Sequence, residues 1–529
     1  MTEIAAFLAD LDVRAVAQRG PLTILRAQVT RAQWRAAAPA ARARGGRLVA
    51  LWGTDRRAAL GHDVVAAAYG LADGLAWLEL PLAADAGENP RYPSLAAVYP
   101  CAGRMQRAAF DLSGLAAEPG AGEPIDARPW LRHAAWPAGF HPLRDASDGA
   151  ARCAAPAEDY AFVAVAGDGV HEIAVGPVHA GIIEPGHFRF SVVGEKVLRL
   201  EERLGYVHKG IERRFAGMTL ADGARLAARV SGDSTVAYGW AYCMAAEALA
   251  GVDPPPRAAA LRAFALERER VANHLGDLGA LGNDAGFAFG LAQFSRLRED
   301  WLRRNAECCG HRLLMDWIVP GGVSADPGAA QLDRLLADLA VLERQVREIE
   351  AIYDAHAGLQ DRFVGAGAVP AELARRLDLT GMAARASGVG TDLRQTLGPP
   401  PYPDLGVRVA AVQGGDVAAR VALRFAEVYE SLRLLQRLLQ ELPAGPVRLH
   451  LAADRGPPGA CAAGWIEGWR GEVLVALETG DDGRIRRAHC HDPSWQNWPA
   501  LEHAVIGNIV PDFPLINKSF NLSYSGQDL

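Results

Sequence analysis

The sequence predicts an α+β protein: a small N-terminal α/β domain followed by a mainly helical bundle domain that also carries a β-hairpin and sheet portions. Three observations lead to this prediction. Short apolar runs separated by turn residues fill residues 1–145, long helical patterns dominate after residue 256, and two strand-like runs flank the turn sequence TGDDG. At 529 residues the chain also exceeds what one hydrophobic core usually supports, so at least two domains are expected.

The N-terminal domain is predicted to span residues 1–145. Arg47 to Gly53 (RLVALWG) and Leu75 to Leu80 (LAWLEL) are short apolar runs typical of strands, and the stretches around them favour helices. Residues 146–170 begin with a small, polar and patternless stretch and are predicted to form a linker. The second domain is predicted to cover residues 171–529.

The second domain is predicted to begin with strands in residues 171–194, joined by a loop rich in Pro and Gly. Three long helices should follow, because apolar residues recur every three or four positions and so share one buried stripe. These stripes comprise Leu261, Phe264, Val271, Leu275 and Leu278; Leu335, Leu339, Leu342, Val346 and Ile349; and Val421, Phe425, Val428, Leu432, Leu435 and Leu439. Residues 472–478 and 484–491 should form the hairpin around TGDDG.

The composition is that of a globular protein, with 50% hydrophobic and 22% charged residues. A net charge of only −7 argues against a nucleic-acid partner. No apolar run is long enough to span a membrane, and the N-terminus does not resemble a secretory signal. The seven cysteines are scattered and form no CxxC pair, which argues against a disulfide framework or a cysteine-ligated metal site. Glycine-rich phosphate loops are also absent, so the chain is expected to bind no cofactor of its own.

Three segments are unusually dense in polar residues and glycine: GPVHAGIIEPGHFRF with the nearby LGYVHKGIERR, then RVSGDSTVAYGWAY, and finally FPLINKSFNLSYSGQDL. Each also has a purely structural explanation. The SGDST sequence, for example, is a good helix N-cap because Ser and Asp side chains accept hydrogen bonds from free backbone N–H groups. Residue spacing alone therefore does not establish a functional site in any of the three segments.

Four charged or titratable residues, Glu267, Arg270, His274 and Asp277, lie three or four positions apart on one predicted helix. This spacing favours a ladder of ion pairs, with a proton-carrying row as the alternative. His489 and His491 would share one face of a strand, but further metal ligands are lacking nearby.

Taken in order, these segments resemble a known family. Together with ERERVANHLGDLG, VPGGV, RASGVGTDLR and GDVAARVALRFAEVYESLR, they are similar to the large subunit of membrane-bound group 4 nickel–iron hydrogenases of the formate-hydrogenlyase type. That family includes the 49 kDa subunit of complex I. The resemblance runs from about Val175 to the C-terminus. Residues 1–145 resemble the 30 kDa subunit of complex I, through YPSLAAVYPCAGRMQRAAFDLSGL and FHPLRD.

The sequence departs from this family at the metal ligands. An active hydrogenase of the family carries RxCGxC and DPCxxC, whose four thiolates hold nickel and iron. Here Ser231, Ser234, Ser523 and Gly526 occupy those four positions. A serine hydroxyl is a poor ligand for these metals. The resemblance therefore implies the fold without a nickel–iron centre, like the energy-converting hydrogenase-related complexes.

The quinone ligands of the 49 kDa subunit are also missing, since Ile183 and Gly232 occupy their positions in an ungapped comparison. The resemblance implies instead a remodelled cavity that holds a quinone or another small electron acceptor. Glu184 or Asp233 would relay protons there. The candidate lining residues are His179, Glu184, His187, Arg229, Ser231, Asp233, Ser234, Tyr238, Ser523 and Tyr524.

The resemblance also implies partners. An iron–sulfur small subunit would deliver electrons from its cluster, and antiporter-like membrane subunits would lie on the other side. The chain itself would be a peripheral protein on the cytoplasmic face of the cell membrane. The alternative hypothesis is a redox-silent subunit that only couples the soluble and membrane arms.

Overall fold

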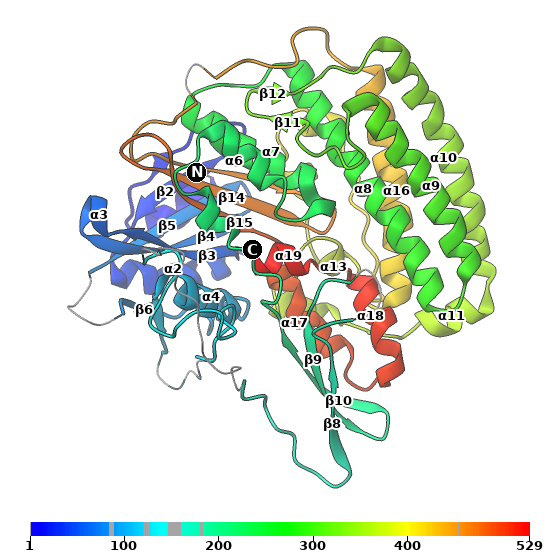
Figure 1. Cartoon of the computed structure of the whole chain (residues 1–529), viewed down its shortest axis with the longest axis horizontal. Helices are drawn as coiled ribbons and strands as arrows, with labels where there is room; N and C mark the ends of the chain where they lie inside the picture. The colour runs from blue at the N-terminus through cyan, green and yellow to red at the C-terminus, as the bar shows by residue number, and fades with distance from the viewer. Residues whose placement is uncertain are drawn as a thin grey trace.

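The computed structural model describes residues 2–83, 89–120, 122, 124, 126–145, 160–179, 183–451 and 454–529. Most of the predicted linker, residues 146–159, lies outside this part of the chain. The predicted α+β architecture is confirmed: a sheet-rich N-terminal region and a helical region with small sheets pack against each other (Figure 1). Across the described ranges, no helix combines the length and the apolar character needed to cross a bilayer.

The N-terminal region is built on a sheet with the strand order β1-β2-β5-β4-β3, in which only β2 and β5 run parallel. Helices α1, α2 and α4 contribute apolar side chains such as Phe7, Trp34 and Met105 to its core. Its elements are α1 (Glu3–Asp10), β1 (Val16–Ala17), β2 (Ile24–Gln28), α2 (Arg31–Ala43), β3 (Arg47–Arg56), α3 (Arg57–Leu60), β4 (His62–Leu71), β5 (Gly74–Leu82), β6 (Arg91–Pro93), α4 (Ala102–Ser113) and β7 (Ala116–Glu118). The two strands predicted here, β3 and β5, are both present and longer than predicted.

The second region begins with the antiparallel sheet β10-β9-β8, as the sequence predicts. It is followed by helices that enter the bundle. The elements are β8 (Val170–Val175), β9 (His187–Val193), β10 (Lys196–Arg203), α5 (Ile211–Phe215), α6 (Leu220–Ala227), the 3-10 turn η1 (Gly232–Ser234), α7 (Thr235–Ala250), α8 (Pro256–Asp284), α9 (Ala288–Cys309), β11 (Ile318–Val319), β12 (Gly322–Val323), α10 (Ala329–Ala355) and α11 (Ala357–Phe363).

The remaining elements complete the bundle and add the predicted hairpin as part of a three-stranded sheet, β13-β14-β15. They are α12 (Ala371–Arg376), α13 (Gly381–Arg385), α14 (Leu393–Thr396), α15 (Tyr402–Leu405), α16 (Val417–Gln440), β13 (Cys461–Glu467), β14 (Glu472–Thr479), β15 (Ile485–His491), α17 (Ser494–Ala504), η2 (Val510–Asp512), α18 (Phe513–Phe520) and α19 (Tyr524–Asp528).

Helices α8, α9, α10 and α16 form the bundle seen at the right of Figure 1. The predicted apolar stripes of these helices are buried, except for the partly buried Leu439 at the end of α16. All five stripe residues of α10, for example, lie in the core. Helix α8 is exceptional because it is buried on nearly every side, including its charged residues. Buried charges need partners, and α8 therefore carries much of the polar network described below.

The two regions are joined sheet against sheet. Trp52 and Trp77 of the N-terminal sheet share one buried cluster with Trp465 and Leu474 of the β13–β15 sheet. Around it, Arg56 pairs with Glu79 of its own sheet and with Glu478 across the joint. The joint thus combines apolar burial with buried ion pairs.

Gln18 provides a test of this joint. Its side chain acts as an extra strand partner for Ala463, accepting from the Ala463 N–H and donating to the Ala463 carbonyl, both at 2.7 Å. Replacing Gln18 with Ala should lower the free energy of unfolding by about 1–3 kcal/mol, because both backbone groups lose their partner. Urea unfolding would measure this loss. Gln436→Ala, at an exposed position of α16, should change it by less than about 0.5 kcal/mol; equal effects would refute the role of Gln18.

Candidate functional site

Three segments that are far apart in the sequence meet in one cluster of polar side chains. Ser231 precedes η1, Ser523 lies between α18 and α19, and Arg470 lies in the turn between β13 and β14. The Ser231 Oγ donates to Asp233 Oδ1 at 2.7 Å and lies 3.1 Å from the Ser523 Oγ. We call Ser231, Asp233, Ser234, Arg470 and Ser523 the serine cluster.

Arg470 holds the serine cluster together. Its two terminal nitrogens contact both carboxylate oxygens of Asp233, at 2.9 and 2.5 Å, and one of them also lies 3.3 Å from the Ser234 Oγ. Burial raises the pKa of Asp233, but the charge of Arg470 and the bonds from Arg470 and Ser231 outweigh this effect, and the net pKa is lowered. Asp233 is therefore an anion in a fixed position.

Gly526, the fourth position, lies beside the serine cluster and has no room for a side chain. Its N–H donates to the Ser523 Oγ at 2.8 Å. A Cβ atom at Gly526 would lie 2.3 Å from Asp492 Oδ2, and the same carboxylate accepts a hydrogen bond from the Tyr238 hydroxyl at 3.0 Å. Asp492 and Tyr238 thus occupy the space that a larger residue at this position would need.

Gly526→Ala should therefore destabilise the protein by about 1–3 kcal/mol, because the new methyl group forces Asp492 to move. Gly103→Ala is the matched control. Gly103 lies inside α4 with nothing within 4 Å of the added Cβ, so alanine should stabilise the helix by about 0.5–1 kcal/mol. Thermal unfolding of both variants would measure the opposite signs; a neutral Gly526→Ala would contradict the crowding.

The exposed side of the site is formed by Glu184 and Lys209. The Glu184 Oε2 accepts a hydrogen bond from the Ser525 N–H at 3.1 Å. Partial burial lowers the pKa of Lys209, and the nearby carboxyl groups of Glu184 and Asp528 oppose that shift. We call Glu184, Lys209, Ser525 and Asp528 the rim.

Asp528 is the buried carboxyl group of the rim. One of its carboxylate oxygens accepts from the Val207 N–H at 3.0 Å. Burial is the largest effect on this carboxyl and, although backbone hydrogen bonds act against it, raises its pKa to about 7. Asp528 can therefore gain or lose a proton near neutral pH.

This raised pKa predicts a pH effect on stability. The Asp528 carboxyl has a pKa of about 7 in the folded protein against 3.8 without the fold. Its contribution is therefore fully present below about pH 4 and is lost as the pH rises to about 7. Urea unfolding at several pH values should show a shallower decline over this window in Asp528→Asn than in the wild type. Parallel curves would contradict the raised pKa.

The other predicted residues divide into two groups. Tyr524 borders the rim and packs against Trp498, with ring centroids 4.8 Å apart. His179 and His187 instead brace the connection between β8 and β9, through contacts with the carbonyls of Gly186 and Gly176 at 2.9 and 3.2 Å. Five of the ten predicted residues belong to the serine cluster or the rim, and Tyr238 and Tyr524 pack beside them. His179, His187 and Arg229 lie elsewhere.

Arg229 lies apart from the serine cluster. Its guanidinium forms a two-point ion pair with Asp316, with both distances 2.6 Å. Asp316 and its neighbour Leu314 both have left-handed backbones, with φ values of 62° and 61°. Arg229 therefore fastens residues 310–316 to the segment that carries the serine cluster.

The row on α8 is a buried network and only in part the predicted ladder. Within the row, Arg270 lies 3.7 Å from Glu267. The remaining partners come from other elements: His274 and Arg270 contact Glu427, and Asp277 pairs with Arg424. The Asn521 side-chain amide donates a hydrogen bond to Asp277 at 2.7 Å, and the Asn521 backbone carbonyl accepts one from Arg470. The row thus continues to the serine cluster.

Sequence reasoning missed Arg470, Lys209, Asp528 and Asp492. Arg470 lies in the WRGE sequence at the start of β14. An arginine next to a glycine at the edge of a strand is only a weak indication of a site residue. The other three are ordinary charged residues whose role depends on which distant segments face them. In the described part of the chain, no group of three or more His, Cys, Asp or Glu side chains is arranged to hold a metal.

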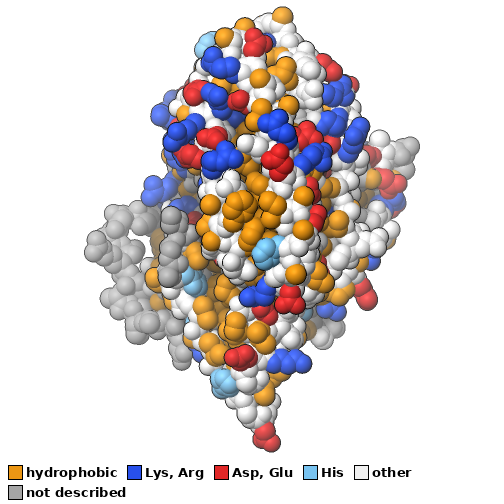
Figure 2. All heavy atoms as spheres, turned by 90° about the vertical axis from the view of Figure 1, so that its right-hand side faces the viewer, with side chains coloured by type: hydrophobic (Ala, Val, Ile, Leu, Met, Phe, Trp, Pro, Cys, Tyr) orange, Lys and Arg blue, Asp and Glu red, His pale blue; other side chains and the backbone are white. Residues whose placement is uncertain are grey.

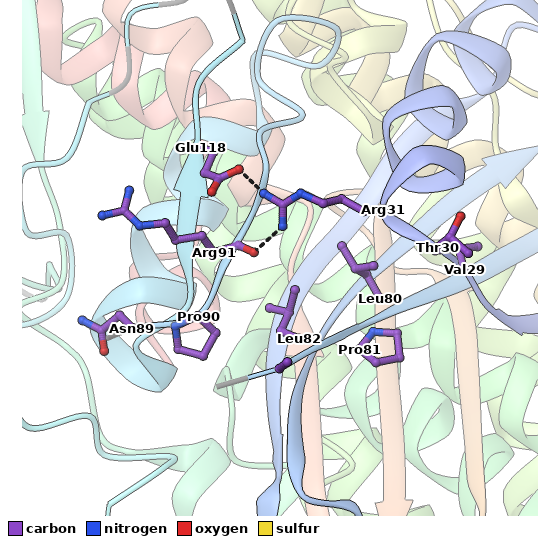
Figure 3. Close-up of a pocket in the computed structure, with 11 residues that line it drawn as sticks. Val29, Thr30, Arg31, Leu80, Pro81, Leu82, Asn89, Pro90, Arg91 and Glu118 are labelled. Carbon is purple, nitrogen blue, oxygen red and sulfur yellow. Dashed lines mark hydrogen bonds and ion pairs between the residues drawn. The ribbon is translucent and has the colours of Figure 1, made fainter. Parts of the chain in front are cut away.

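A cavity of about 580 Å³ lies in the N-terminal region, between the ends of β2 and β5 and strands β6 and β7 (Figure 3). Its floor consists of Leu80, Pro81 and Leu82. The Arg31 guanidinium lies across it, donating to the Arg91 carbonyl at 2.9 Å and pairing with Glu118. None of the predicted site residues lines this cavity.

Two family models match the chain. The 49 kDa subunit of the respiratory-chain NADH dehydrogenase matches residues 284–458, and the 30 kDa subunit of the same enzyme matches residues 27–152. Along the chain, the 30 kDa match comes first and falls in the N-terminal region, and the 49 kDa match follows in the second region.

Curated relatives extend over nearly the whole chain. Formate hydrogenlyase subunit 5 of Escherichia coli is 32% identical and covers 92% of this chain and 85% of its own length. The membrane-bound hydrogenase subunit alpha of Pyrococcus furiosus is 29% identical over 68% of this chain and 87% of its own length. A chain from the structure of an archaeal membrane-bound sulfane sulfur reductase shares the fold, with a TM-score of 0.64 and 24% identity over 68% of this chain and 98% of that chain.

Proposed function

The chain belongs to the family of the complex I 49 kDa and 30 kDa subunits and the group 4 hydrogenase large subunits, and we propose that it transfers electrons to a quinone or another small acceptor without a nickel–iron centre. It is a subunit of a membrane-bound respiratory complex. Its electrons would come from the iron–sulfur cluster of a partner subunit, since no group of three or more His, Cys, Asp or Glu side chains in the described ranges is arranged to hold a metal.

The serine cluster supports the proposal that no nickel–iron centre is bound. Thiolates are the ligands that these metals require, and the corresponding positions offer two hydroxyls at 3.1 Å, a third hydroxyl beside Arg470, and a glycine with no room for a Cβ. Arg470 adds a positive charge where a cation would have to be held. The donor set therefore does not fit the metal centre.

The rim supports the proposal of a small electron acceptor. Reduction of a quinone carbonyl needs a hydrogen-bond donor and a proton for each electron. Lys209 is an exposed donor, and the buried Asp528 titrates near neutral pH because burial raises its pKa to about 7. Glu184 is exposed and contacts the same segment, so it would exchange protons with water.

The surface is compatible with partners on the bundle side. On the face formed by α9, α10 and α11, charged side chains of both signs cover the upper part, and hydrophobic side chains form a band across the middle and lower part (Figure 2). Exposed apolar residues of these elements include Phe289, Ile352 and Val364. An apolar band of this kind is typical of surfaces buried in an assembly. We propose peripheral attachment on the cytoplasmic face, with the iron–sulfur and antiporter-like subunits as partners.

The second candidate is a redox-silent coupling subunit. It is favoured by one observation: the groups of the serine cluster bond to one another, so the cluster holds its shape without any ligand. In this case the chain would transmit shape changes between the soluble and membrane arms and take no part in electron transfer.

The deciding experiment uses the complex extracted from membranes with its native partners. The reduced complex is mixed with a quinone analogue while the iron–sulfur EPR signals are followed, and nickel is assayed on the same sample. Reoxidation without nickel is the expected result. Iron–sulfur EPR signals that stay unchanged when the quinone analogue is added would favour the coupling role. Stoichiometric nickel would overturn the proposal.

The two candidates also differ in their response to substitution. Glu184→Gln combined with Asp233→Asn should abolish acceptor reduction in an intact complex if these carboxylates carry protons. Glu172→Gln is the matched control, because Glu172 is a similarly exposed glutamate on β8 that pairs with Arg189. Unchanged activity of the double variant would support the coupling role.

A further inference from the structure

A hydrogen-bonded row of three buried residues links the N-terminal region to the rim. The row consists of Trp130, Gln527 and Asp528, which are 1%, 1% and 0% exposed. The Gln527 side-chain amide donates to Asp528 Oδ1 at 2.6 Å, and its oxygen accepts from the Trp130 indole N–H at 2.8 Å. Trp130 lies in the segment that follows β7, whereas Gln527 and Asp528 lie on α19. One side chain thus connects the rim carboxyl to the other region of the fold.

Trp130 determines which way the Gln527 amide points. A primary amide carries an acceptor oxygen and a donor nitrogen, and a half-turn of the group exchanges them. An indole N–H can only donate, so the amide oxygen must face Trp130 for that hydrogen bond to form. The NH2 group then faces Asp528, whatever the protonation state of that carboxyl. A donor in this place favours the carboxylate anion.

The indole of Trp130 is itself held in place. The guanidinium groups of Arg104 and Arg107, both on α4, lie over its ring at 4.9 and 4.7 Å from the ring centroid. The Trp130 backbone is fixed as well, because its N–H donates to Asp111 at 2.7 Å and its carbonyl accepts from Arg203 at 2.7 Å. An indole anchored on this many sides keeps its N–H directed at the amide, so the amide has one stable orientation.

Other groups around the Asp528 carboxyl act on its proton affinity in both directions. Burial and the nearby Glu184 raise the pKa of Asp528, and the Val207 N–H and the Lys209 ammonium group oppose that rise. The titratable groups that face Asp528 from the elements around it are Glu184, His208, Lys209 and Tyr524. The His208 ring contacts the backbone carbonyl of Asp528, at 2.7 Å, and not the carboxyl. The amide of the row therefore joins the groups that favour the anion.

We propose that Trp130 and Gln527 are positioning residues for Asp528: the indole N–H holds the Gln527 amide so that its NH2 group always faces the carboxyl. Through this row the N-terminal region takes part in setting how tightly the rim holds its proton. Both residues act through Asp528 and not on an acceptor. The use of that proton in reducing an acceptor rests on the proposed function, whereas the positioning itself does not.

The first test titrates Asp528 in the full chain. The infrared carbonyl band of protonated carboxylic acids is followed from about pH 4 to about pH 10, and the component of Asp528 is the one that Asp528→Asn lacks. In the wild type its midpoint should lie near pH 7. Trp130→Phe frees the amide to turn its oxygen toward the protonated carboxyl, so the midpoint should rise by about one pH unit, a tenfold gain in proton affinity. A midpoint that does not move overturns the proposal.

Gln527→Met separates the positioning from a general effect of losing the indole. Methionine has a similar length and volume but no donor, so the midpoint should again rise by about one unit. Trp130→Phe should then add nothing in the Gln527→Met background, because its effect passes through the amide. A further rise in the double variant overturns the role of Trp130.

Trp317→Phe is the matched control. Trp317 is as buried as Trp130, at 1% exposed, and within the described ranges its indole nitrogen has no hydrogen-bond partner. This variant should leave the Asp528 midpoint unchanged, and a shift equal to that of Trp130→Phe would overturn the proposal. Circular dichroism shows which variants fold. If Trp130→Phe does not, Gln527→Met still decides, because an unchanged midpoint in that variant overturns the proposal.

In the purified complex, Trp130→Phe should move the alkaline fall in the rate of quinone reduction upward by the same amount as the infrared midpoint, with little change in the quinone KM. If quinone does not reoxidise even the wild-type clusters, the proposed function fails while the infrared result stands. If the wild type is active and the rate profile stays in place although the midpoint moves, Asp528 is overturned as the proton donor and the positioning role stands.

Discussion

Replacing Glu427 with glutamine is expected to lower the free energy of unfolding by about 3–5 kcal/mol. Glu427 lies on α16 and is the shared anion for two arginines and a histidine of the bundle core. Its carboxylate lies 2.7 Å from Arg385, 3.1 Å from Arg270 and 2.9 Å from the His274 ring nitrogen. The side chains of all four residues are at most 3% exposed. The neutral amide would remove the anion that the two buried guanidinium groups share, and would leave Arg270 with Glu267 at 3.7 Å and Arg385 with Glu467 at 2.9 Å.

The pH dependence gives this prediction a second readout. Burial opposes ionisation of Glu427, but Arg385, His274 and Arg270 outweigh it and hold its pKa well below 4.5. The stabilisation is therefore present above about pH 4.5 and lost as the pH falls. Urea unfolding should show a large gap between wild type and Glu427→Gln at pH 7 and a smaller gap in acid.

The matched control is Glu441→Gln, the same substitution at the C-terminal end of α16. Glu441 pairs with Arg437, and the two side chains are 58% and 37% exposed, so water can replace much of the lost interaction. We expect a loss of about 1 kcal/mol or less. Equal losses in the two variants would show that the buried network adds nothing beyond a surface pair.

The network around Glu427 marks the limit of what periodicity predicts. Sequence reasoning identified the helix and four of its charged or titratable residues, Glu267, Arg270, His274 and Asp277, from their spacing. Spacing within one helix favours pairs between neighbours on that helix. The partners instead come from α13, α16 and the segment before β14, because a helix buried on all sides presents its charges to every neighbour. Helical periodicity contains no information about those neighbours.

The serine cluster was predictable for a different reason. Its three serines were assigned by resemblance to ligand positions, and in any fold that holds one metal centre those positions must converge. The structure brings Ser231 and Ser523 to 3.1 Å. Arg470 and Asp233 could not be paired from the sequence, because their contact depends on how the β13–β14 turn meets η1. The same argument applies to Asp528, whose raised pKa results from burial and not from its sequence context.

The joint between the two regions was not predicted at all. Domain boundaries can be inferred from a change in composition, but an interface is formed by residues that look like ordinary strand residues in each part. Trp52, Trp77 and Trp465 fit the core of a single sheet equally well. The sequence therefore predicts each of the two regions better than it predicts the joint between them. That joint affects the stability of the protein in a way that can be measured.

Arg56→Met should lower the free energy of unfolding by about 3 kcal/mol, because it removes the central cation of that joint. The Arg56 guanidinium lies 2.7 Å from a carboxylate oxygen of Glu79 and 2.7 Å from one of Glu478. The side chains of all three are at most 4% exposed. Methionine fills a similar volume, so no large cavity forms. The lost stability therefore comes from the two buried carboxylates that lose their shared cation. Arg26 and Arg486 remain near them, which places the estimate at the lower end of the range for broken buried pairs.

The number of unfolding transitions tells how the two regions depend on each other. The apolar cluster of the joint is untouched by Arg56→Met, so the regions should still unfold in one step at lower urea, as judged by circular dichroism and by tryptophan fluorescence together. Arg303→Met, at a side chain that is 70% exposed, should leave the midpoint unchanged. Two separate transitions in Arg56→Met would show that the ion pairs, and not the apolar cluster, make the fused regions one cooperative unit.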